Sequence, residues 1–110
     1  MGLKYQEVTE AEQLNSWLLF LYKVPHEPST RRVYVWRKLK RLGAVMLHDS
    51  AWVLPELPAN LEQLRNLSRE IVELGGDSLL WEAHLAGEDQ EEALLVQLAA
   101  SRGHAAAEVL

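Results

Sequence analysis

The chain has 110 residues, a length typical of one domain that buries a core without disulfides or a structural metal. It contains no cysteine, which excludes disulfides, thiolate nucleophiles and Cys-based metal or redox sites, and which fits a reducing cytosol. The net charge of −5 conceals an asymmetry: residues 31–41 hold six basic and no acidic residues, whereas the rest of the chain holds five basic and sixteen acidic ones.

No targeting or membrane segment is predicted. The N-terminal residues lack the basic and apolar regions of a signal peptide. The longest apolar run, Trp17 to Tyr22, is too short to cross a bilayer. We therefore expect a cytoplasmic protein without membrane association.

The first predicted strand spans residues 16–24 (SWLLFLYKV), which are apolar and rich in aromatic and branched side chains. A proline-marked loop follows. A helix is then predicted with Ser29 or Thr30 as its N-cap, an end near Leu42, and Gly43 as the residue that stops it.

A helical wheel gives this helix two faces. The arc expected to pack on the core holds Val35, Trp36, Leu39 and Leu42. The opposite arc is expected to face solvent or a ligand, and it holds Tyr34, Arg37, Lys38 and Arg41, with Arg31 near its edge. Arg32 falls inside the apolar arc, so it should lie in a frayed first turn, find an acidic partner, or hold a bound anion.

The next elements are two short strands, 44–48 and 51–54, around a predicted hairpin turn at Asp49-Ser50. A second helix is predicted from Asn60, with Gln63 completing a capping box. Its apolar positions recur at spacings of three and four, and a glycine pair ends it; those positions are Leu61, Leu64, Leu67, Ile71 and Leu74.

A fourth strand is predicted at residues 78–85 and a third helix at about 90–102, within one domain, 1–110, whose core spans 16–85. The element order predicts an α+β fold, a ferredoxin-like βαββαβ sandwich with an extra C-terminal helix. The two crossover helices should cover one sheet face. A partner should cover the other, which predicts a homodimer.

The basic helix is the main candidate for binding. Its cations suit contacts with phosphate, and the interleaved tyrosine can stack or donate a hydrogen bond. The predicted DNA-contacting residues are Arg31, Arg32, Tyr34, Arg37, Lys38, Lys40 and Arg41. The alternative is a solvated helix face whose last cations stabilise the helix C-terminus.

No catalytic, metal or cofactor site is predicted. The histidines show neither HxH nor HExxH spacing, and no GxSxG, P-loop or GxGxxG pattern occurs. His48 and His84 could meet across two strands, near Asp49 or Glu82, but unrelated surface histidines are the preferred interpretation. The carboxylates fit solvated faces, and the four tryptophans, at positions 17, 36, 52 and 81, are interpreted as core packing.

The stretch YKVPHEPSTRRVYVWRKLKRLGAVMLHDSAWVLP, with ELGGDSLLWEA after it, resembles the N-terminal domain of ChrB, the chromate-resistance regulatory protein family. The resemblance covers roughly residues 16–84. The family's motif positions are taken by Arg32, Trp36, Arg37, Leu39, Lys40, Gly43 and Ala44. It implies a bacterial cytoplasmic transcriptional regulator that represses a chromate-efflux operon and releases it when chromate appears. Assigning DNA contact to the exposed cations is an inference from charge.

Family members continue into a longer C-terminal domain, so this chain is expected to be a stand-alone or reduced version, or to act with a full-length regulator. The alternative function is a protein-interaction or dimerisation module without DNA affinity. More distantly, the chain is similar to PaaX-type repressors and to small CRISPR-associated nucleases of the same fold. Those nucleases hold a metal with an acidic residue after the first strand, where this chain has Val24-Pro25-His26, so an enzyme is not expected.

Overall fold

The computed structural model describes residues 16–48 and 51–109, and within them four strands form one sheet flanked by three helices. The strand order is β2-β3-β1-β4, and every neighbouring pair is antiparallel. This arrangement confirms the predicted ferredoxin-like βαββαβ sandwich with an added C-terminal helix. The elements are β1 (Trp17–Lys23), α3 (Thr30–Leu42), β2 (Val45–His48), β3 (Ala51–Pro55), α4 (Pro58–Glu73), β4 (Asp77–Ala83) and α5 (Glu88–Val109).

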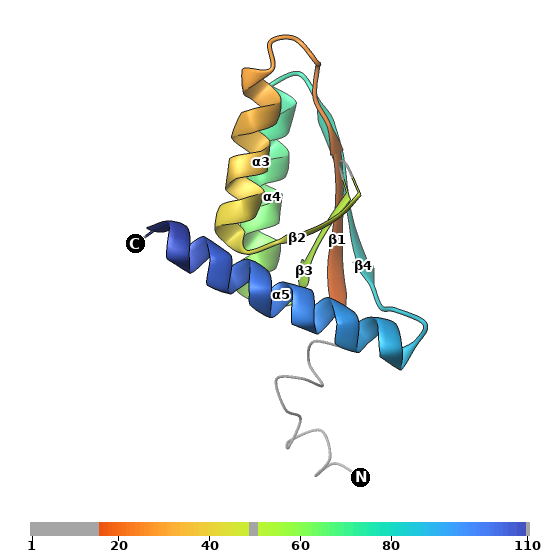
Figure 1. Ribbon diagram of the computed structural model, residues 1–110. Coiled ribbons are helices and arrows are strands. Elements are labelled where there is room, and N and C mark those ends of the chain that lie inside the picture. The colour runs from red at the N-terminus through yellow and green to blue at the C-terminus, as the bar shows by residue number, and fades with distance from the viewer. Residues whose placement is uncertain (1–15, 49–50, 110) are drawn as a thin grey trace.

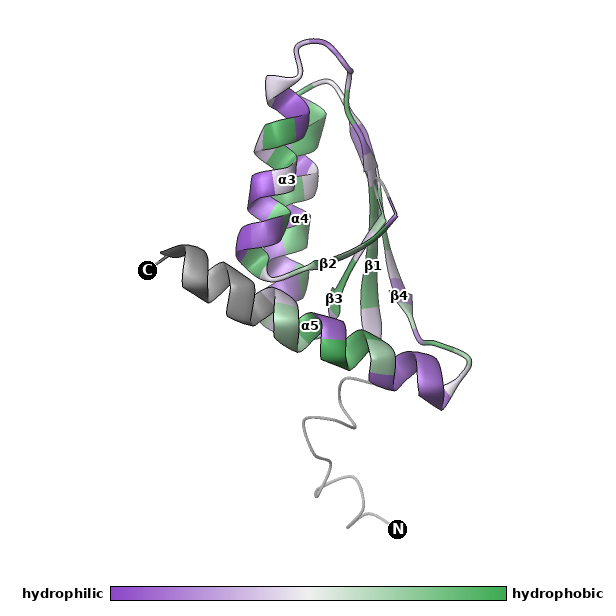
Figure 2. Ribbon diagram, viewed as in Figure 1, coloured by the Kyte–Doolittle hydropathy of each residue, from purple (hydrophilic) through white to green (hydrophobic). Residues whose placement is uncertain are grey.

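Helices α3 and α4 lie side by side over one face of the sheet (Figure 1). Side chains alternate between the two faces of each strand, so every second residue of β1 and β3 points to these helices. Figure 2 shows apolar residues along β1 and polar residues on the outward surface of α3. The buried core of this layer consists of Leu18, Phe20, Val35, Leu39, Ala44, Trp52, Leu54, Leu64, Leu67 and Ile71.

Helix α5 crosses one end of the sheet and covers part of its second face (Figure 1). Leu94 and Leu98 pack there against Trp17, Val45 and Val53. The Trp17 indole N–H donates to both carboxylate oxygens of Glu91, at 2.9 and 2.8 Å. Helix α5 therefore covers the second face only at the end of the sheet where β1 begins.

The end of α3 agrees with the prediction at Gly43. This glycine has φ +83°, a left-handed conformation that costs glycine least. The Gly43 N–H donates to the Lys40 carbonyl, and the Ala44 N–H donates to the Leu39 carbonyl, which satisfies the last turn. At the other end, Ser29 occupies the N-cap position with helical φ and ψ, and its side chain makes no capping hydrogen bond.

The predicted capping box of the second helix is wrong. Helix α4 begins at Pro58 with Leu57 in the N-cap position, three residues before the predicted cap, and Asn60 instead donates its side-chain N–H to the Pro55 carbonyl at 2.9 Å. Proline suits a first helical turn because its φ is preset and the N–H it lacks would have no partner there. The predicted glycine stop is confirmed, with Gly75 at φ +89°.

Gly76 brings the start of β4 against the end of β1. A Cβ on this residue would collide with the Lys23 carbonyl oxygen and crowd Val24. Only glycine permits this close approach of two backbones.

The third helix is longer than predicted, since α5 spans Glu88–Val109 rather than about 90–102. Its first turn holds Glu88, Asp89 and Glu91, whose negative charges interact favourably with the positive N-terminal end of the helix dipole. The hairpin turn predicted at Asp49-Ser50 lies outside the described residues. No helix within the described ranges combines the length and apolar character that a bilayer span requires.

Candidate functional site

Part of the predicted basic face of α3 is bound to α4. The Tyr34 hydroxyl donates to Glu70 Oε1 at 2.6 Å, and Lys38 Nζ lies 3.7 Å from the same oxygen. The hydrogen bond to the Glu70 carboxylate favours the neutral phenol and so raises the pKa of Tyr34 above its ordinary value. Lys38 also lies over the Tyr34 ring, 5.5 Å from its centroid. Tyr34 and Lys38 therefore form one cluster with Glu70 instead of standing free.

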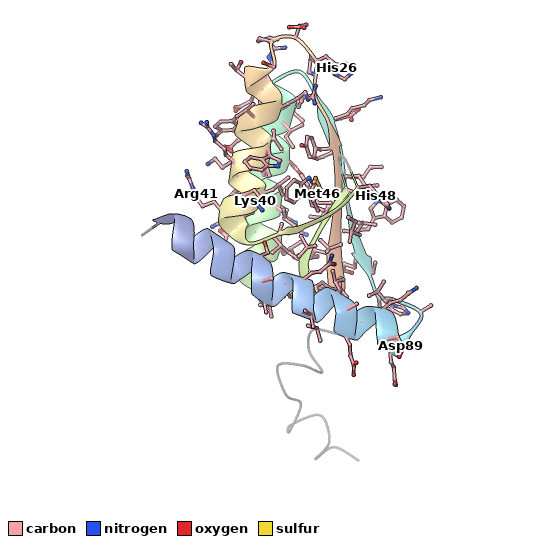
Figure 3. All side chains as sticks on the ribbon, viewed as in Figure 1. His26, Lys40, Arg41, Met46, His48 and Asp89 are labelled. Carbon is pink, nitrogen blue, oxygen red and sulfur yellow. The ribbon has the colours of Figure 1, made fainter. Side chains whose placement is uncertain are left out.

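The outward side of α3 keeps its positive charge. Arg37 and Arg41 are exposed, and neither makes an ion pair with any residue that the structure describes. Figure 3 places Arg41 on the side of α3 turned away from the sheet. Arg31 is half-buried, so the free positive face is narrower than the seven residues predicted from the sequence.

Trp36 is exposed, and its predicted place in the core is wrong. Its side chain is 44% exposed, and it lies one helical turn from Arg32 on one side and from Lys40 on the other. Lys40 Nζ is 5.8 Å from the centroid of the Trp36 ring, within range of a cation–π interaction. The pattern Arg-x3-Trp-x3-Lys is the sequence signal that could have identified this stripe.

Arg32 satisfies one of the three expectations for it, because it lies in the first turn of α3 and is exposed. Its Nη1 lies 3.3 Å from His26 Nδ1, which accepts the hydrogen bond because a guanidinium can only donate. Figure 3 places His26 in the loop that precedes α3. We call Arg32, Trp36 and Lys40 the α3 stripe.

A groove of about 860 Å³ adjoins the stripe, between α3, the loop after β1 and the edge strand β2. Burial raises the pKa of Tyr22 on its floor, while the nearby Trp52 indole and the charge of Arg32 oppose that shift. Trp52 Nε1 is buried and has no hydrogen-bond partner among the described residues. The groove is lined by Tyr22, Lys23, Val24, Pro25, His26, Ser29, Arg32, Val33, Trp36, Met46, Gly75, Gly76 and Asp77.

The three described histidines, His26, His48 and His84, are not brought together. His48 ends β2 and His84 follows β4, which are the two opposite edges of the sheet, so the predicted possibility that they meet is wrong. Figure 3 shows His26 and His48 well apart. Among the side chains of residues 16–48 and 51–101, no group of three histidines or carboxylates is placed to hold a metal ion.

The second sheet face carries an exposed apolar surface beyond α5. Leu79 is 58% and Trp81 is 52% exposed, and they pair across strands with Leu21 and Leu19. The prediction that Trp81 packs in the core is therefore wrong, whereas Trp17 and Trp52 are buried as predicted. We call Leu79 and Trp81, with the half-buried Leu21, the open sheet face.

Comparison with known proteins identifies relatives of this chain. It is 37% identical over 79 residues to Protein ChrB of Cupriavidus metallidurans, a match that covers 71% of this chain and 24% of that protein. It is similar to the crystal structure of a hypothetical protein, TT1823, from Thermus thermophilus, with 27% identity, a TM-score of 0.47, and coverage of 64% of this chain and 82% of that one. The family described as "Protein ChrB, N-terminal" matches residues 32–110. The chain belongs to this family of ChrB N-terminal domains.

Proposed function

We propose that this chain is a DNA-binding module of a ChrB-type transcriptional regulator that controls a chromate-resistance operon in the cytoplasm and has no enzymatic activity. Membership of the family supports the regulatory role. The observation that carries DNA binding is the set of cations on α3 that no described acid neutralises. These cations are Arg31, Arg32, Arg37, Lys40 and Arg41.

Charge separation would orient the module on DNA. The chain outside residues 31–41 holds sixteen acidic and five basic residues, so most of its surface repels a phosphate backbone. The arginines on the outward side of α3 suit bidentate contacts with phosphate. The protein should therefore approach a duplex through α3.

Salt dependence gives a quantitative expectation. Glu70 engages Lys38, which leaves five of the six cations in residues 31–41 for phosphate contacts. Five contacts predict that log K falls with log salt at a slope of about −4.5. Fluorescence anisotropy with promoter DNA from beside the protein's own gene, at two salt concentrations, measures this slope. Release of the DNA by chromate in the same titration would support control by chromate.

Reversing two charges on α3 should strongly weaken DNA binding. The double variant Arg37→Glu and Arg41→Glu should lose about 100-fold in affinity at low salt, since each charge-assisted contact is worth about 1.5 kcal/mol or more. Both residues are exposed, so circular dichroism should show an unchanged fold.

The matched control makes the same charge change on α4. Arg65 and Arg69 are also exposed on a helix, but they lie outside the stripe and the groove. Arg65→Glu with Arg69→Glu should keep most of the affinity. Equal losses in the two double variants would contradict the proposal, because binding would then follow net charge alone.

A second candidate function is supported by a different observation. The open sheet face exposes Leu79 and Trp81 on the edge strand β4, which suits contact with another protein surface. On this reading the chain is an interaction or dimerisation module that works beside a full-length regulator, without DNA affinity. Lack of binding to every DNA probe, together with stable self-association, would favour this second function.

A further inference from the structure

We propose that the groove beside α3 binds one unpaired nucleotide, with its base stacked on Trp36 and its flanking phosphates held by Arg32 and Lys40. This inference rests on the proposed DNA binding and specifies how the strand is held. It distinguishes the α3 stripe from Arg37 and Arg41, which face away from the groove toward the duplex backbone.

The spacing of the stripe fits a base between two phosphates. A helix rises about 1.5 Å per residue, so Arg32 and Lys40 start about 12 Å apart with Trp36 midway between them. Their long side chains can reach phosphates on either side of one stacked base. Surfaces that bind single strands combine a positively charged groove with an exposed aromatic ring in this way.

The groove has the size and the polar atoms that a base requires. Its volume of about 860 Å³ lies within the range of small-molecule pockets. Tyr22 contributes a polar side chain to the lining of the groove. Ser29 and His26 add polar groups at the rim. A base edge could form hydrogen bonds with the side chains of Tyr22, Ser29 and His26, which an apolar ligand could not do.

An intact base pair does not fit this arrangement. The bases of a paired duplex stack on one another, so none offers a free face to Trp36. The groove lies between a helix and an edge strand, with Met46 opposite the stripe, and it admits a single extruded base rather than a double helix. The preferred partner is therefore DNA with an unpaired or easily unstacked position.

The test compares two probes in fluorescence-anisotropy titrations with the whole chain. One is a fully paired promoter duplex and the other is the same duplex with a single extra, unpaired thymine. We expect tighter binding to the second probe. Trp36→Ala should weaken that binding by about 5- to 150-fold, the range found for loss of one base–aromatic stack, while changing binding to the paired duplex by about twofold or less.

Matched variants serve as controls for this test. Trp81→Ala removes a tryptophan of similar exposure from the opposite sheet face and should leave the preference intact. Trp36→Phe keeps a ring for stacking and should retain most of it, which separates stacking from loss of fold. Arg32→Gln and Lys40→Gln should each lower the affinity for the probe with the unpaired thymine more than Arg65→Gln on α4 does.

The outcomes separate this inference from the proposed function. If the wild-type chain binds both probes equally, or if Trp81→Ala lowers the preference as much as Trp36→Ala, the nucleotide site is wrong while DNA binding stands. If neither probe binds at low salt, the proposed function fails as well. A preference that is lost only with Trp36 or its flanking cations establishes the site.

Discussion

Glu70 determines how much of α3 is available to a ligand. Its carboxylate accepts the Tyr34 hydroxyl hydrogen bond and lies near Lys38, across the contact between the two helices. Lys38 is 41% exposed in its side chain, so this ion pair is worth about 1 kcal/mol or less. A DNA phosphate bound on α3 would therefore compete with the Glu70 carboxylate for Lys38.

A second pair of acids gives a prediction for pH dependence. Glu56 follows β3 and lies near Glu82 on β4. The hydrogen bond with Glu82, then burial and the charge of Glu82, raise the pKa of Glu56 above its ordinary value. An acid whose pKa is raised by folding adds its full contribution to stability below its pKa in the unfolded chain. This contribution is lost as the pH rises through its pKa in the folded chain. At neutral pH, therefore, the two carboxylates repel one another.

Glu56→Gln should raise the free energy of unfolding at pH 7 by about 0.2–1 kcal/mol, the value of an exposed charge pair. At about pH 4, where the wild-type hydrogen bond forms, the gain should vanish. Urea unfolding at both pH values measures the difference. Glu62→Gln, which removes an exposed acid from α4, is the control, and an equal gain at both pH values would contradict the argument.

At the scale of elements, α5 is attached to the sheet by a narrow apolar contact. Leu94 and Leu98 are 5% and 3% exposed, whereas Val96 between them is 69% exposed. Leu98→Ala should cost about 2–3 kcal/mol of stability, since it opens a cavity above Trp17 and Val53 at the edge of the core. Val96→Ala should cost about 0.5 kcal/mol or less, and thermal unfolding compares the two. A small loss from Leu98→Ala would mean that α5 is not firmly docked.

The strands and the ends of helices could be predicted from the sequence because their signals are local. The apolar run of β1 and the stop at Gly43 depend on neighbouring residues only, and both were found. The start of α4 was missed because Pro58 and Asn60 both suit a first turn, and the polar signal was preferred. Asn60 serves the preceding strand instead, through the Pro55 carbonyl.

The candidate site was less predictable because it depends on contacts between distant residues. A helical wheel predicts the direction in which the Trp36 side chain points, but not which part of the molecule it faces. In the structure it lines a groove at the edge of the sheet. Glu70 is 36 residues from Tyr34, so no spacing in α3 reveals that it engages that tyrosine and Lys38. The exposure of the Trp81 side chain likewise depends on how far α5 extends across the sheet.

At the scale of the whole molecule, the open sheet face predicts self-association. We expect the chain to form a homodimer through β4, measured by size-exclusion chromatography with light scattering. Leu79→Lys with Trp81→Lys should give a monomer, because four buried charges would replace an apolar contact. Val72→Lys, at a 65% exposed position on α4, should leave the dimer intact. A wild-type chain that stays monomeric at high concentration would contradict this prediction.

The sheet separates the groove beside α3 from the open sheet face on its other side. In β4, the odd-numbered positions point to the open side and the even-numbered ones to the helices, as Ser78 shows through its bond to Ser68 of α4. The protein can thus hold two occupants at once without competition for surface. Because no residue lines both surfaces, a substitution in one of them can change what it binds without altering the other.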